Sequence, residues 1–255
     1  MLPSANSVLL PGMCGRFGQI SKAEKYARRF GLNVADGLDH APNYNTDIGN
    51  MALIATSNHT LIGAMFGYTP DWSPKPMYLF NARAEGDFNP ENNPDYQGPK
   101  GIFNKPSFRK VIHSQRAVVP VDYFVEGPET ERLKKPFVVQ RQNGEPFLLA
   151  GLFGQWTQPE TGEVRHTFTI ITTANSPLLG KVGHHRSPLV LAEKDLALWL
   201  NPATPKTQVA QLMIPFSDAG FEAIPVSAQM GRRNTAKSPN NSPDLLQPIG
   251  PAFTS

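Results

Sequence analysis

We expect no internal disulfide bond, membrane span or secretory signal in this chain of 255 residues. Its single cysteine, Cys14, cannot form an internal disulfide, which favours a reducing compartment such as the cytoplasm. The longest strongly apolar run, residues 147–153, is far shorter than the roughly 20 residues that cross a bilayer. Residues 1–12 carry no charge, so they lack the basic start of a signal peptide. We therefore expect a cytoplasmic protein with no membrane contact.

Sequence motifs of common cofactor and metal sites are missing as well. There is no phosphate-binding glycine loop, no paired CxxC and no HExxH. His184 and His185 are adjacent in the chain, so they cannot chelate a metal from one face of a helix. We expect neither a metal nor an organic cofactor.

Proline, in contrast, is in excess. The chain has 25 prolines, about one residue in ten, against a typical share of roughly 5%. So many prolines predict numerous turns and strand edges, and they argue against a helical bundle. The hydrophobic share of 40% is enough for a buried core, while the net charge of +3 is only weak evidence for a polyanionic partner.

One helix is predicted soon after residue 20. Ser21 and Glu24 have the spacing of a capping box, and Gly31 is suited to end the helix. The apolar face of this helix comprises Ala23, Tyr26, Ala27 and Phe30. The opposite face carries a set of cations that we interpret as solvated rather than DNA-binding, namely Lys22, Lys25, Arg28 and Arg29.

Two pairs of apolar runs have the pattern of β-hairpins. Residues 51–56 and 61–66 flank a short polar turn. Residues 137–140 and 147–153 flank Asn143-Gly144, the strongest short hairpin signal. We therefore predict that the two strands of each pair are neighbours in a sheet.

Further elements are predicted along the second half of the chain. β-branched or aromatic runs favour strands over residues 117–125 and 167–173. Helices are expected over residues 195–200 and from Thr204 onward, where Pro205 can begin a helix.

The domain organisation follows from composition. Residues 1–12 are predicted to be a leader, and residues 231–255, which are rich in Pro, Asn, Ser and Gly, an irregular tail. We predict that residues 13–230 form a single α+β domain built mainly on antiparallel strands.

The most distinctive chemistry lies in the segment Met13-Cys14-Gly15-Arg16-Phe17. Taken alone, an isolated thiol is most often a small buried side chain. Removal of Met13, however, would leave Cys14 at the chain terminus, with an amine and a thiol on one carbon skeleton. This pair of groups can react in a way that neither group can alone.

An N-terminal cysteine can capture an aldehyde in two steps. Its α-amine, with a reference pKa of roughly 7.7–8.0, is partly unprotonated near neutral pH and condenses with the aldehyde to an iminium. The neighbouring thiol then adds to the same carbon and closes a thiazolidine ring, a step favoured because it is intramolecular. An abasic deoxyribose in its open form presents such an aldehyde.

Short blocks along the whole chain resemble one family, in order. The blocks are residues 13–17, Pro42-Asn43-Tyr44-Asn45, residues 66–72, Asn81-Ala82-Arg83-Ala84-Glu85, residues 116–126, Thr172-Thr173-Ala174-Asn175 and residues 184–188. From Met13 to about Pro248, the sequence resembles the SOS-response-associated peptidase family, the abasic-site-processing proteins of bacteria and eukaryotes. The resemblance implies a barrel-like β core with a few flanking helices and a role in the DNA damage response.

The resemblance also implies catalytic roles for four residues. Cys14 would be the nucleophile that crosslinks the protein to DNA and shields the lesion. Asn81 would hold the sugar or the opened aldehyde, Glu126 would transfer protons during iminium formation, and His184 would stabilise the ring-opened sugar and assist its release. The implied partner is single-stranded DNA containing abasic sites, bound by a monomer, in a bacterial nucleoid or a eukaryotic nucleus.

Three further residues are candidates for DNA contact. Arg16 and Arg83 would bind flanking phosphates, because a planar guanidinium can hold two oxygens at once. Trp72 would stack on a base, with a core tryptophan as the alternative. Phosphate contacts carry no base information, so binding would be independent of sequence and sensitive to salt.

Plain structural alternatives exist for the other candidates. Glu126 follows an apolar run, which favours a partly buried carboxyl, but a glutamate on the surface at a strand end fits the same pattern. His184 fits either a proton carrier in a loop or a solvent-facing side chain. Asn81 and Arg83 would point to the same side of a strand over residues 77–85, where cross-strand hydrogen bonds would also explain them.

The sequence departs from the family's pattern at several positions. Gly127 stands where the family has a Trp after the glutamate, which removes a surface that would prop the opened DNA. Ser187 replaces a Met, and Ala117 replaces a Cys.

With residues 1–12 attached, Cys14 has an amide nitrogen that cannot form an iminium. We favour a translation start at Met13; cleavage before Cys14, and an inactive chain that keeps the leader, are the alternatives.

Two hypotheses of other classes remain open. In a cysteine peptidase, Cys14 and His184 would act as nucleophile and base, and blocking the terminal amine would leave activity intact. A non-covalent single-stranded DNA-binding module would form no bond that survives denaturation.

Overall fold

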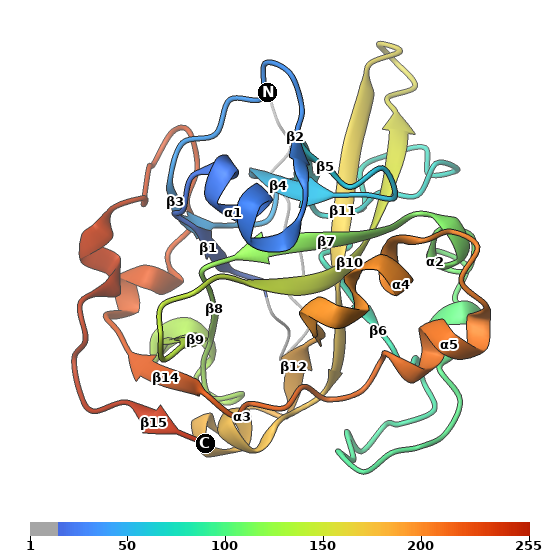
Figure 1. The fold of residues 1–255 in the computed structure, drawn as a ribbon. Helices are drawn as coiled ribbons and strands as arrows, with labels where there is room; N and C mark the ends of the chain where they lie inside the picture. Colours follow the sequence, from blue (N-terminus) through green and yellow to red (C-terminus); the bar gives the residue numbers. More distant parts are fainter. Residues whose placement is uncertain (1–14) are drawn as a thin grey trace.

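Nine strands form one continuous sheet in this computed structural model, which describes residues 15–255. They are β2 (Asn33–Val34), β4 (Met51–Ala55), β5 (Thr60–Phe66), β6 (Asn81–Arg83), β7 (Arg116–Val121), β10 (Phe147–Thr157), β11 (Val164–Ala174), β12 (Arg186–Pro188) and β13 (Val190–Leu191). Because β11 pairs with β10 and also, in parallel, with β5, the path β11–β10–β7–β4–β5 closes into a five-stranded barrel (Figure 1). Most pairs are antiparallel, so the predicted mainly antiparallel, barrel-like core is confirmed.

A second sheet of six antiparallel strands packs beside the barrel. Its strands are β1 (Phe17–Gln19), β3 (Asn43–Thr46), β8 (Tyr123–Glu126), β9 (Phe137–Arg141), β14 (Phe221–Pro225) and β15 (Phe253–Thr254). β8 lies between β1 and β9, and Glu126, its last residue, pairs with Phe137 of β9.

Short helices connect and cover the strands. They are α1 (Ala23–Phe30), α2 (Val111–Ser114), α3 (Pro177–Val182), α4 (Leu196–Leu200) and α5 (Lys206–Gln211), with the 3-10 turns η1 (Gly101–Phe103), η2 (Arg132–Lys134), η3 (Glu193–Asp195), η4 (Ala228–Gly231) and η5 (Pro243–Leu246). The predicted helices are confirmed as α1, α4 and α5. Within residues 15–255, none of the helices has the length and apolar character needed to span a membrane.

The two largest of three apolar clusters lie on opposite faces of the barrel strands, because successive side chains of a strand point to opposite faces. In β4, Leu53 and Ala55 pack in a cluster shared with α1 and α4, whereas Ala52 and Ile54 pack in the cluster shared with the second sheet. Phe17 of β1 joins the sheets, with its ring centroid 5.3 Å from that of Phe66 on the barrel.

One predicted hairpin is confirmed and the other is wrong. Residues 51–55 and 60–66 form the antiparallel pair β4–β5. The strands on either side of Asn143-Gly144 belong to different sheets, since β9 pairs with β8 and β14 while β10 pairs with β7, β11 and β13. The turn therefore carries the chain from one sheet to the other, and each strand finds its partners far away in the sequence.

The predicted strand over residues 117–125 is interrupted at Asp122, where the chain leaves the barrel for the second sheet. The buried Asp122 carboxylate accepts hydrogen bonds from the backbone N–H groups of Ile20 (2.7 Å) and Ser21 (3.0 Å), from Ser21 Oγ (2.5 Å) and from the Tyr26 hydroxyl. The predicted capping box at Ser21 is consequently wrong: its hydroxyl binds Asp122, and α1 begins without a side-chain cap.

The last residues, red in Figure 1, run from β3 at one edge of the second sheet to β15 at the other. Asn241 accepts a hydrogen bond from the Tyr44 backbone N–H (2.6 Å), and β15 then pairs with β14. Residues 231–255 contain η5 and β15 and are otherwise irregular. The boundary at residue 231 stays a prediction.

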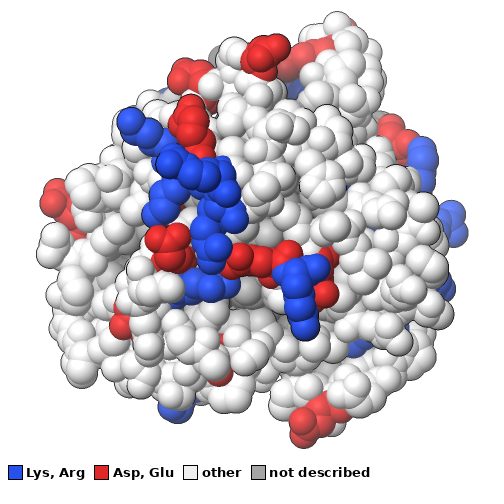
Figure 2. All heavy atoms as spheres, in the orientation of Figure 1, with Lys and Arg blue, Asp and Glu red and all other residues white. Residues whose placement is uncertain are grey.

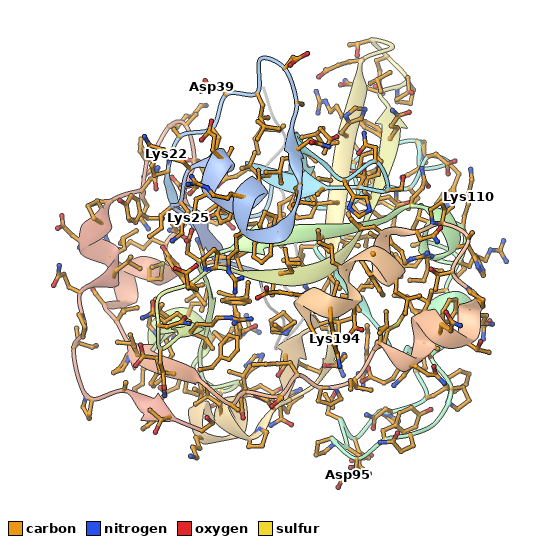
Figure 3. The ribbon with its side chains drawn as sticks, in the orientation of Figure 1. Lys22, Lys25, Asp39, Asp95, Lys110 and Lys194 are labelled. Atoms are coloured by element: carbon orange, nitrogen blue, oxygen red, sulfur yellow. The ribbon has the colours of Figure 1, made fainter. Side chains whose placement is uncertain are left out.

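Replacement of Asp122 tests its role as the link between the two sheets. We expect Asp122→Ala to lower the free energy of unfolding by roughly 2–4 kcal/mol, because four donors lose a charged acceptor in a buried setting. Urea denaturation measures this loss. The exposed Asp39 is the matched control (Figure 3). Equal stabilities of Asp122→Ala and Asp39→Ala would show that the hydrogen bonds of the Asp122 carboxylate do not stabilise the fold.

Candidate active site

A cavity of about 760 Å³ opens where the end of β8 meets the start of β1 and the turns η2 and η4. Its lining brings together four residues from distant parts of the chain, namely Gly15, Arg16, Glu126 and His184. Their convergence makes this cavity the candidate site. Cys14 lies outside the described residues.

Glu126 and His184 form a buried pair in the cavity wall. Their side chains are 4% and 3% exposed, and His184 Nε2 lies 3.4 Å from Glu126 Oε2. On the other side of the ring, His184 Nδ1 lies 2.9 Å from the carbonyl oxygen of Gly127. Since a carbonyl oxygen only accepts, Nδ1 carries a proton in this contact, and Nε2 is directed to the carboxylate. The solvent-exposed alternatives for both residues are excluded by this burial.

The loop after α3 holds His184 in place. Ser176 caps α3 by accepting a hydrogen bond from the Leu179 N–H (3.4 Å), and Gly183 ends the helix in the left-handed conformation, at φ 85°. The His184 N–H then donates to the Leu179 carbonyl (2.9 Å), and Asn175 Nδ2 donates to the His184 carbonyl (3.1 Å). The backbone N–H and the backbone carbonyl of His184 are thus both hydrogen-bonded, which holds the residue in place.

His185 lies against the same imidazole. The two rings are stacked, with centroids 5.9 Å apart and planes 11° from parallel, and His185 Nδ1 is paired with Glu129. Burial lowers the pKa of His185, while the nearby Glu129 carboxylate raises it in part. This second pair lies between His184 and the solvent.

Arg16 is buried beside the cavity and bound by three oxygens. Its Nη1 donates to Asn45 Oδ1 (2.7 Å) and its Nη2 to the Gly231 carbonyl (3.1 Å), and Nη2 lies 3.6 Å from Asp47 Oδ2. Burial lowers the pKa of Arg16, and Asp47 opposes that shift. Asp47 also forms an ion pair with the exposed Arg233. Phosphate binding by Arg16 stays a prediction.

The remaining predicted residues lie at different distances from the cavity. Asn81 is half-buried in β6, follows the lining residue Phe80, and donates through Nδ2 to the Phe80 carbonyl (3.0 Å). Arg83 binds the Asn89 carbonyl and is absent from the cavity lining among residues 15–255. Trp72 is 58% exposed, so it is not a core tryptophan, but it too lies outside the lining that the structure describes. Their roles in DNA binding stay predictions.

Sequence reasoning missed several groups at the cavity. Asp47, Glu129 and Arg233 belong to no recognisable motif, and the Gly127 carbonyl cannot be identified from its residue type. Only the fold reveals them, because each acts on a residue far away in sequence or through the backbone.

In the described part of the chain, no three His, Cys, Asp or Glu side chains converge as a metal site requires.

Comparison with known proteins identifies the family. Residues 13–233 match the family model described as SOS response associated peptidase. The chain belongs to this family. It is 31% identical over 245 residues to the abasic site processing protein YoqW of Bacillus subtilis (strain 168), a match that covers 92% of this chain and 99% of that protein. Identity to the abasic site processing protein YedK of Escherichia coli (strain K12) is 25% over 248 residues, covering 93% and 100% of the two chains.

Solved structures agree with this assignment. A crystal structure of a protein from Bacteroides thetaiotaomicron superposes with a TM-score of 0.74 at 26% sequence identity, over 92% of this chain and 100% of that one. The fold is therefore that of the family, and the resemblance predicted from the sequence blocks is confirmed.

Gly127, next to Glu126, has no room for a side chain. A Cβ atom on Gly127 would lie 2.1 Å from the Arg132 carbonyl oxygen and 2.8 Å from that of Lys135, far inside van der Waals contact. The turn η2 folds directly over Gly127 and occupies the space of a side chain. A larger side chain at this position therefore does not fit this backbone.

This close approach predicts the effect of adding one methyl group. We expect Gly127→Ala to destabilise the fold by about 2 kcal/mol or more, because η2 must move away from β8. Denaturant unfolding measures the loss.

The matched control is Gly63→Ala on β5, where a Cβ would meet only the flexible end of Met51 at 3.4 Å. We expect the control to change stability by less than about 1 kcal/mol. If Gly127→Ala is as stable as the control, the packing of η2 on Gly127 is not as described.

Proposed function

We propose that this protein captures abasic sites in single-stranded DNA by forming a thiazolidine crosslink through Cys14. The observation that carries the proposal is that Gly15 lines the same cavity as Glu126 and His184. Cys14 is joined to Gly15 by one peptide bond, which keeps consecutive Cα atoms about 3.8 Å apart. The relatives YoqW and YedK are abasic site processing proteins by name, which supports the same substrate.

The chemistry follows from the groups around the cavity. The Cys14 amine adds to the C1′ aldehyde of the opened sugar to give a carbinolamine, which loses water to form an iminium. Glu126 accepts a proton as the amine adds and returns it to the departing hydroxyl, since it is held beside the cavity at the end of β8. The thiolate then adds to the iminium carbon, so that aldehyde and aminothiol are converted to thiazolidine and one water.

We propose that His184, whose imidazole faces the Glu126 carboxylate, takes part in the same proton transfer. Its proton on Nδ1 is committed to the Gly127 carbonyl, so Nε2 is the nitrogen available for proton exchange with Glu126 and the sugar. We propose that this exchange stabilises the ring-opened sugar. Asn81, beside the lining residue Phe80, would hold the aldehyde oxygen.

The reaction requires that Cys14 begins the mature chain. Translation from Met13 followed by removal of that methionine would produce this terminus, and so would cleavage before Cys14, in keeping with the peptidase in the family's description. Either route gives the same free amine.

Substitution of the proposed catalytic groups tests the chemistry. With a chain that begins at Cys14 and an abasic oligonucleotide, we expect a denaturation-resistant adduct on a gel that Cys14→Ala abolishes. Glu126→Gln and His184→Gln are expected to slow adduct formation by roughly 10²–10⁴-fold, because each removes a proton-transfer group.

The exposed Glu163 and His113 supply matched controls, and Glu163→Gln and His113→Gln should react at the wild-type rate. An adduct formed by Cys14→Ala would show that another residue is the nucleophile. Complete loss of the complex on denaturation of the wild-type protein would instead indicate a non-covalent DNA-binding module.

A further inference from the structure

Three exposed cations line one side of the cavity, and we call them the cationic wall: Arg132, Lys134 and Arg232. Arg132 and Lys134 belong to η2, and Arg232 follows η4. None of the three is predicted by the family's sequence blocks. They lie next to the catalytic pair, since Glu126 and His184 line the same cavity.

The acidic groups on this side of the cavity are already occupied. Glu129 is paired with His185, Glu131 with Lys135 (2.8 Å), and Asp47 with Arg16 and Arg233. Within residues 15–255, no carboxylate forms an ion pair with any member of the cationic wall. Three positive charges therefore remain uncompensated at the cavity.

The backbone that carries these cations packs closely against two glycines. The Arg132 carbonyl oxygen occupies the side-chain position of Gly127, and the Leu133 carbonyl oxygen lies 2.2 Å from the Cβ position of Gly231. The Arg232 carbonyl accepts hydrogen bonds from Asn45 Nδ2 (3.2 Å) and Asn240 Nδ2 (3.1 Å). Little backbone ordering is thus left to occur on ligand binding.

Several cations elsewhere on the protein are instead paired with acidic residues. On the face shown in Figure 2, lysines and arginines gather over and beside α1 but alternate with acidic residues. Arg29 there contacts both Glu145 and Glu193, and Arg141 contacts Glu193. This face carries opposite charges in close pairs, whereas the cationic wall does not.

We propose that the cationic wall binds the backbone phosphates of the DNA strand on one side of the lesion. The inference rests on the proposed function, in that the DNA is the strand whose abasic sugar reaches Glu126. Guanidinium and ammonium groups bind phosphate through charge-assisted hydrogen bonds. Where the family's pattern has a tryptophan, η2 folds over Gly127 and presents charge at the cavity. In this protein, phosphate contact replaces an aromatic prop.

The salt dependence of DNA binding tests the proposal. We compare the wild-type protein with the triple variant Arg132→Gln, Lys134→Gln, Arg232→Gln, using an undamaged single-stranded oligonucleotide. Loss of three phosphate contacts should reduce the slope of log K against log salt by about 2 and lower affinity by about 10-fold or more at low salt.

Two controls accompany this variant. The triple variant Lys22→Gln, Arg28→Gln, Lys194→Gln removes the same charge from exposed sites outside the cavity lining, where Figure 3 labels Lys22 and Lys194, and it should keep the wild-type slope. The variant Arg132→Lys, Arg232→Lys keeps the charge and should also keep the slope. Thermal unfolding checks that all variants fold.

An unchanged slope in the cationic-wall variant, or an equal decrease in the control, would overturn the proposal. The binding assay uses undamaged DNA and needs no covalent bond, so its result is separate from the fate of the crosslinking chemistry. If the wild-type protein forms no adduct but shows the expected difference in slope, the proposed function fails while the cationic wall remains a phosphate-binding surface.

Discussion

The pairing of Glu126 with His184 is the interaction on which the site depends. Both side chains are almost completely buried, and a carboxylate in such a place is costly unless a partner holds it. The pair exists only because β8 ends at the cavity, because α3 stops at Gly183, and because the Gly127 carbonyl fixes one ring nitrogen. Three separate parts of the fold thus meet to hold Glu126 and His184 together in the cavity that Gly15 also lines.

The close packing around Gly127 connects this pair to the surface. The same glycine whose carbonyl binds His184 lets η2 fold over β8, and η2 in turn packs against Gly231. A single backbone arrangement therefore sets the imidazole orientation and the position of the cationic wall. The proposed proton transfer and the proposed phosphate contact would therefore depend on the same backbone packing.

The sequence predicts elements that form through local contacts, and it fails where distant strands decide the outcome. Helix α1 and the β4–β5 hairpin follow from periodicity and a short turn. The Asn143-Gly144 turn has an equally strong local signal, but β9 and β10 find better partners in different sheets. The closure of the barrel by β5 and β11 joins residues about a hundred positions apart, and no periodic pattern encodes such a pairing.

The site was predictable to the extent that it lies in short motifs. Glu126 and His184 were expected from family blocks, and the structure brings them together at one cavity with Arg16. Asp47, the Gly127 carbonyl and the cationic wall have no sequence signal, because each depends on which distant backbone lies alongside it.

The central claim is that a free amine and thiol at Cys14 are delivered to this cavity, and mass mapping of the DNA adduct tests it most directly. Chains that begin at Met1 and at Cys14 are incubated with an abasic oligonucleotide, digested and analysed. The account predicts one adduct, only in the chain that begins at Cys14, on the peptide that starts with this residue, with a mass equal to the sum of both components less one water. The same adduct on a chain that still carries residues 1–13, or an adduct on a different peptide, would contradict it.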